Sequence, residues 1–138
     1  MERRAQLQRS LVRSHAAGSG QEVEPEVVRA MMLLRLSTLA TGRTGVRIEV
    51  ARAYAAMLSA GISPVVREYG SLGCSGDLAP LAHCALAAMG EGTVRVAAGN
   101  GAAAGPKVPA LRMPSHIRNI CSATMCPNEG ESAIGNVR

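Results

Sequence analysis

The chain has 138 residues and a formal net charge of +5, from 15 Lys and Arg against 10 Asp and Glu, which fits one modest domain. Apolar residues make up 47%, yet Trp and Phe are absent, so a core must be built from Leu, Val, Ile, Met and Ala, as in a helical layer cut from something larger. The basic residues are scattered, and no apolar run approaches the roughly 20 residues of a membrane span, which argues against nucleic-acid binding and against a membrane span.

The first two helices are predicted from apolar spacing and from the residues at their ends. Leu7 and Leu11 stand four positions apart and a glycine follows, so residues 2–17 are expected to be helical. Residues 24–40 form the second helix, with Pro25 in the first turn. Its apolar residues cover more than one narrow face, so we expect this helix to be largely buried.

Two further helices are expected before residue 90. Small alanines repeat at helical spacing in residues 46–60 and would allow close packing of a neighbouring helix. Residues 62–73 contain proline and glycine and predict a loop or a short extended segment. Asp77 can then cap a helix over residues 78–89, in which Pro80 is tolerated because it falls in the first turn.

The character of the chain changes after Val96. The remaining sequence carries four prolines and shows no sustained apolar period. We therefore expect residues 99–138 to form an irregular or disordered tail. The predicted fold class is mainly α, with residues 1–98 as the helical part.

The cysteines predict free thiols rather than a disulfide framework or a metal centre. No secretory segment follows the first residue, so we expect a cytoplasmic protein with Cys74, Cys84, Cys121 and Cys126 reduced. His116 stands near Cys121 and Cys126, but three ligands without a tight Cys-x-x-Cys spacing do not predict a zinc site.

The loop before the fourth helix allows two conventional chemical interpretations. A serine-hydrolase turn needs glycine two residues after the serine, but Asp77 follows Ser75 at that spacing. Cys74 could act as a thiolate at the start of a helix, with His83 or His15 as its base. His83 lies two turns into the helix, which places it poorly for that role.

A third interpretation uses the backbone of the same loop. Glycine has no Cβ, so in a tight bend the amide nitrogen of Gly76 can reach the carbonyl carbon of Cys74 and close a five-membered ring. Loss of one water from the ring and of the Ser75 hydroxyl as a second water would leave a methylidene carbon. That carbon would be an electrophile of a kind that no side chain supplies.

The segment GSLGCSGDLAPL resembles the signature of the aromatic amino-acid ammonia-lyases, which usually reads Gly-Ser-x-Gly-Ala-Ser-Gly-Asp-Leu-Ala-Pro-Leu. Those enzymes make a methylidene-imidazolone (MIO) group from Ala-Ser-Gly and use no metal for it. The resemblance therefore implies autocatalytic formation of MIO from Cys74, Ser75 and Gly76. Only the backbone of the first residue enters the ring, so cysteine should be tolerated there.

Upstream stretches are similar to the histidine ammonia-lyase branch of this family: LQRSLVRSHAAGSG, VVRAMMLLRLSTLATG, TGVR and AGISPVV. The resemblance implies that His15 reaches the substrate pocket, that Asp77 shapes the turn, and that Leu78 holds the loop on the helical bundle. It implies a helical-bundle fold, a homotetramer, and elimination of ammonia from L-histidine to give urocanate. A phenylalanine or tyrosine ammonia-lyase or aminomutase is the alternative.

The resemblance covers roughly residues 6–98 and has departures. Arg43 stands where this branch commonly has an aromatic residue. Family enzymes are several times longer, so we expect this chain to lack the segment that brings the catalytic tyrosine and the later substrate-binding helices. The tail of residues 99–138 does not look like the family, which favours a truncated or frame-shifted piece of a longer gene. An inactive helical remnant is therefore a further alternative.

Overall fold

The computed structural model describes residues 2–73, 76–97, 105–110 and 115 of the chain. The elements in these residues are α1 (Glu2–His15), β1 (Ser19–Glu22), α2 (Pro25–Ala40), α3 (Ile48–Ser59), β2 (Ile62–Pro64), β3 (Arg67–Tyr69), α4 (Leu78–Ala88), β4 (Thr93–Val96) and β5 (Lys107–Pro109). The predicted mainly α fold is confirmed.

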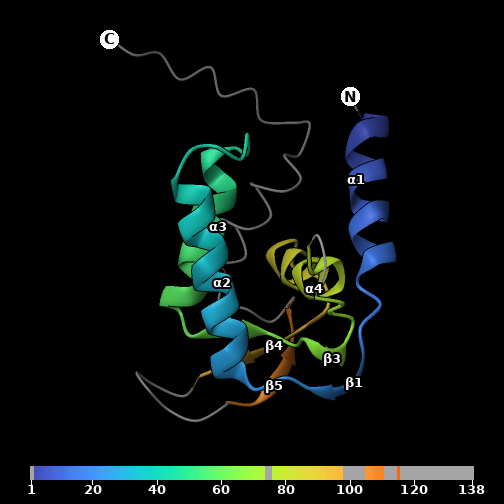
Figure 1. Cartoon of the computed structure of the whole chain (residues 1–138), viewed down its shortest axis with the longest axis vertical. Coiled ribbons are helices and arrows are strands. Elements are labelled where there is room, and N and C mark those ends of the chain that lie inside the picture. Colours follow the sequence, from blue (N-terminus) through green and yellow to red (C-terminus); the bar gives the residue numbers. More distant parts are fainter. Residues whose placement is uncertain (1, 74–75, 98–104, 111–114, 116–138) are drawn as a thin grey trace.

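The helices form the body of the molecule, and the short strands lie together at one end of it (Figure 1). α2 and α3 lie side by side, and α4 lies between this pair and α1. β1 pairs antiparallel with β3, whereas β2, β4 and β5 form an antiparallel sheet in the order β2, β4, β5. The sheets lie at the end of the helical layer where α1 leads into β1.

The four helices predicted from the sequence are all present, but the burial expected for α2 is wrong. Within α2 only Val28, Met32 and Leu39 are buried, whereas Leu33 and Leu34 are 58% and 71% exposed. The apolar residues of α2 are spread around its circumference, while α3 and β2 cover only part of it in the described chain. Among the described residues, no helix combines the length and the apolar character needed to cross a membrane.

The structure contains more β-strands than the sequence predicted. The segment expected to be a loop or short extended stretch holds β2 and β3, which agrees with its second option. β5 lies inside the tail expected to be irregular, and it pairs with β4 in the register Val94 to Val108. Ala110, directly after β5, is fully buried. The prediction of an irregular tail is therefore wrong for residues 107–109, while most of 99–138 lies outside the described residues.

The core lies between the helical layer and the three-stranded sheet and is built without Phe or Trp. Met32, Met57, Ile62 and Val94 are all fully buried and belong to one cluster with small alanines from α3 and α4. Each large side chain buried in this way contributes about 1.5 to 3 kcal/mol. The core thus holds α2, α3, α4 and the sheet in one arrangement.

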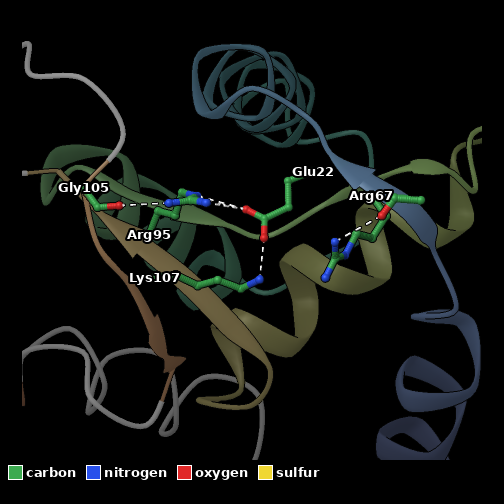
Figure 2. A network of polar contacts seen from close by, with 6 residues as sticks. Glu22, Arg67, Arg95, Gly105 and Lys107 are labelled. Carbon is green, nitrogen blue, oxygen red and sulfur yellow. Dashed lines mark hydrogen bonds and ion pairs between the residues drawn. The ribbon is translucent and has the colours of Figure 1, made fainter.

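Charged side chains link the N-terminal part of the chain to the elements that follow α4. Glu22 of β1 accepts hydrogen bonds from Arg95 of β4, at 3.0 and 2.7 Å, and from Lys107 of β5 (Figure 2). Arg13 of α1 donates two hydrogen bonds of 2.8 Å to the Glu91 carboxylate. These contacts hold α1 and the end of β1, one on each side of the turn that joins the two elements.

Candidate active site

A cavity of about 310 Å³ lies among the four helices, and its wall is mostly apolar. Its polar side chains are His15 from α1, Arg35 from α2 and Tyr54 from α3. Leu78 and Leu81 bring the first turn of α4 to the same wall. The cavity therefore joins the predicted substrate residue to the start of the helix that follows the Cys-Ser-Gly triplet. An apolar cavity with a few convergent polar groups is the usual form of a small-molecule site.

His15 is the last residue of α1, and its ring is held by the helix itself. Its Nδ1 lies 2.8 Å from the carbonyl oxygen of Leu11 and 3.1 Å from the Ser14 hydroxyl oxygen. The carbonyl can only accept, and the Ser14 hydroxyl donates its proton to the same carbonyl at 2.8 Å. In the neutral ring the proton is therefore assigned to Nδ1, and Nε2 carries the lone pair. Among the described residues Nε2 has no hydrogen-bond partner. His15 can thus offer Nε2 as an acceptor to a molecule in the cavity.

The loop that carries the triplet is closed at its base by two side chains. The Ser71 hydroxyl donates a hydrogen bond of 2.6 Å to Oδ1 of Asp77. Asp77 stands at the N-cap position of α4 but makes no side-chain hydrogen bond to the helix, so its predicted capping role is wrong. The Asp77 carboxylate accepts the hydrogen bond of the Ser71 hydroxyl instead. Residues 74–75, the first two of the predicted MIO triplet, lie outside the described residues.

Gly76, the third residue of the predicted triplet, has a backbone conformation that favours glycine. Its φ is +131°, a region that residues with a side chain rarely adopt. A Cβ built on Gly76 would meet no atom within 4 Å, so conformation rather than space requires glycine here. The amide of Leu78 donates to the Gly76 carbonyl at 3.1 Å, which bends the chain sharply before α4.

His83 is occupied by a structural contact and is a poor candidate for a base acting on Cys74. The backbone N–H of Gly18 donates to Nε2 of His83 at 3.2 Å. Burial lowers the pKa of His83, and the nearby positive charge of Arg67 lowers it further. A neutral ring with Nε2 already accepting has no free lone pair for the triplet.

Two other ionisable groups near the cavity are held neutral by burial. Burial raises the pKa of Tyr54 well above its usual value, with a smaller contribution from Cys84 and an opposing one from Arg35. Burial raises the pKa of the free Cys84 thiol to about 12. Tyr54 therefore fits a hydrogen-bonding role better than that of a base, and Cys84 is no nucleophile. His116, Cys121 and Cys126 lie outside the described residues.

The structure brings some predicted residues together and adds others. His15 and Leu78 line one cavity, while Asp77 lies at the base of the loop. Arg35 and Tyr54 were missed in the sequence. The sequence offered only a weak signal for them: Arg35 is an arginine within an apolar helix, and Tyr54 is one of only two aromatic residues in the chain.

The model of the aromatic amino acid lyase family matches residues 1–117. Over 91 residues the chain is 72% identical to the histidine ammonia-lyase of Streptomyces griseus, covering 66% of this chain and 18% of that enzyme. Over 89 residues it is 52% identical to tyrosine 2,3-aminomutase of Chondromyces crocatus, covering 64% and 17%.

The likeness extends to three dimensions. The crystal structure of histidine ammonia-lyase from Trypanosoma cruzi superposes with a TM-score of 0.69 at 34% identity, over 83% of this chain and 20% of that one. The chain spans about a fifth of the length of the relatives it matches. The helical layer described above is thus the kind of layer found in ammonia-lyases.

Proposed function

The chain belongs to the aromatic amino acid lyase family, and from this premise we propose that it contributes the electrophile-forming loop of a histidine ammonia-lyase, which eliminates ammonia from L-histidine to give urocanate. The observation that carries the proposal is the shared cavity of His15 and Leu78, because it brings the residue proposed to bind the substrate to the start of the helix that follows the triplet. The higher identity to a histidine ammonia-lyase than to a tyrosine aminomutase supports this choice of substrate.

The prosthetic group in this proposal is MIO, made by the chain from its own residues. The Gly76 nitrogen bonds to the Cys74 carbonyl carbon, and two waters leave, one of them carrying the Ser75 hydroxyl oxygen. The positive φ of Gly76 and the Ser71 to Asp77 hydrogen bond support a loop bent for that closure. Once formed, the group supplies an electrophile that makes the substrate's amine a better leaving group.

The residues of the cavity then have separate tasks. His15 accepts a hydrogen bond through Nε2 from the imidazole N–H of the substrate, because its own Nδ1 proton is held by Leu11. The mostly apolar wall lowers the local polarity, which strengthens such polar contacts. Leu78 holds the loop against the helices, and Asp77 keeps its base closed. The base that removes the β-proton is not among these residues.

The assembly in this proposal is a homotetramer without a metal cofactor. The exposed apolar residues Leu33 and Leu34 of α2 support it, because large apolar side chains at this exposure favour burial against another surface. The cytoplasmic location expected from the sequence stays a prediction.

Intact-mass measurement on the purified chain tests the chemistry. We expect a mass two waters below that calculated from the sequence. Ser75→Ala should keep the full mass with unchanged helicity, since it removes the hydroxyl that leaves. Cys74→Ala, which restores the family's usual triplet, should still lose two waters and serves as the matched control. Full mass in both the natural chain and Cys74→Ala would contradict ring formation.

The substrate is tested separately with L-histidine and L-tyrosine. We expect little or no urocanate from the chain by itself, because Tyr54 and Cys84 are held protonated. Binding of L-histidine should nevertheless shift the His15 ring signals in an NMR titration. A shift with L-tyrosine alone would favour the alternative of a phenylalanine or tyrosine ammonia-lyase or aminomutase, and the absence of any shift would favour an inactive remnant.

A further inference from the structure

A second histidine, distant in sequence from the first, holds the turn that follows His15. His83 lies on the side of α4 that meets this turn, and its Nε2 accepts the Gly18 N–H at 3.2 Å. Gly18 stands three residues after His15 and directly before β1. The contact therefore joins the exit of α1 to the middle of α4.

The packing around Gly18 leaves the turn little freedom. A Cβ built on Gly18 would lie 3.0 Å from Nε2 of His83 and 3.2 Å from Cβ of Arg67. A Cβ built on Gly70 would lie 2.9 Å from Cβ of Ala79 and 3.3 Å from Cα of Gly18. The backbone of the turn thus touches β3 and α4 directly, with His83 supplying the polar partner.

α4 connects this contact to the triplet loop. Leu78 begins the helix directly after Asp77, and His83 follows five residues later. A helix rises about 1.5 Å per residue, so the two residues lie roughly 7.5 Å apart along a rigid rod. Any residue fixed to His83 is therefore fixed relative to the end of the loop.

The electrostatics of His83 suit an acceptor. Nε2 can accept the Gly18 N–H only while it carries a lone pair, and protonation would turn it into a donor facing another donor. The charged group that faces His83 from the neighbouring strand is Arg67, and together with burial it disfavours the protonated ring. The neutral, Nδ1-protonated form is thus the one that the fold selects.

We propose that His83 is a positioning residue: by accepting the Gly18 N–H it sets the place of His15 relative to Gly76 and the start of α4. The inference rests on the proposed function only in giving His15 a substrate to bind. The structural claim is that the position of the His15 ring depends on a hydrogen-bond acceptor where Nε2 of residue 83 now lies.

The test compares His83→Leu with His83→Gln in the full 138-residue chain by NMR. Leucine fills the space without an acceptor, whereas glutamine can place its carbonyl oxygen near the position of Nε2. In His83→Leu we expect the Gly18 amide to exchange about fivefold faster, in line with the loss of one hydrogen bond, and the His15 ring nitrogen signals to move. In His83→Gln both readouts should return toward those of the natural chain.

Two results would overturn the inference. Unchanged Gly18 exchange and His15 signals in His83→Leu would show that the contact positions nothing. Equal disturbance in both variants would assign the effect to side-chain shape rather than to the acceptor. If His83→Leu does not fold, a pH titration of the natural chain decides, because the Gly18 amide shift must then follow the protonation of His83. The intact mass of the chain measures ring formation independently of these signals. A failure of the proposed function can therefore be told apart from a failure of this inference.

Discussion

Two glycine turns of this chain look alike in sequence and differ in structure. α1 and α2 each end shortly before a glycine, Gly18 and Gly42. Around Gly18 a side chain would meet His83 and Arg67 at 3.0 and 3.2 Å, whereas a Cβ on Gly42 would have no atom within 4 Å. Gly42 has a φ of +71°, while the φ of Gly18 is not positive.

The difference separates two reasons for glycine. Gly42 is favoured by its backbone conformation, which disfavours most side chains, and ends a helix at the surface. Gly18 is required by close approach, because β3 and α4 lie against it. Only the second kind of turn fixes the position of one element relative to another, because other elements pack against it. Gly18, the turn of this kind, is the one next to His15.

The largest effect is expected from Gly70→Ala, because Gly70 directly follows β3 and packs against the turn of Gly18. Its φ of +154° disfavours a side chain, and the new Cβ would lie 2.9 Å from that of Ala79. Strain and overpacking together should lower the free energy of unfolding by about 3 kcal/mol. Denaturant unfolding measures it. Gly90→Ala is the control: Gly90 has a φ of +78° and no atom near its Cβ, so it should lose only about 1 kcal/mol.

A matched pair, Gly18→Asn and Gly42→Asn, tests the comparison directly. Asparagine tolerates positive φ, so at Gly42 the change in unfolding free energy should stay below about 0.5 kcal/mol. At Gly18 the same residue must displace His83 or Arg67, and we expect a loss of about 2 kcal/mol. Equal losses at the two positions would show that the turns do not differ as described.

The sequence predicted this difference only in part. Helix spacing and helix ends gave all four helices, because those signals are local. Gly18 and Gly42 both read as helix stops, since nothing local reveals that His83 and Gly70 approach the first from 65 and 52 positions away. The role of Gly18 appears only when distant elements are placed together.

The missed strands and the exposed face of α2 have the same cause. β5 is three residues long and forms by pairing with β4, so proline-rich composition around Lys107 hid it. The breadth of the apolar surface of α2 predicted burial but not which neighbour provides it. In the candidate site, the triplet and His15 were predicted from the resemblance to a known family. The hydrogen bond from Ser71 to Asp77 could be recognised only in the folded structure.

The smallest of the three main effects, leaving the controls aside, concerns the far end of the segment that begins at Gly18, where Glu22 contacts Arg95 and Lys107. Hydrogen bonds first from Lys107 and then from Arg95 lower the pKa of the Glu22 carboxyl below its usual 4.5. The folded chain therefore binds a proton there less readily than the unfolded chain. Its stabilisation is present above the unfolded pKa and is lost as the pH falls through the lower, folded value.

Glu22→Gln should consequently cost about 1 kcal/mol at neutral pH, a modest value because the three side chains are 21% to 40% exposed. Measured by denaturant unfolding, the difference from the natural chain should stay constant above pH 5 and shrink as the pH falls below about 4.5. A difference that grew on acidification would mean that Glu22 is protonated in the fold. Glu22 lies at the opposite end of β1 from Gly18, so the variant should leave the contact between Gly18 and His83 intact. An altered Gly18 amide signal in the variant would show that the turn depends on the charge of Glu22 rather than on close packing.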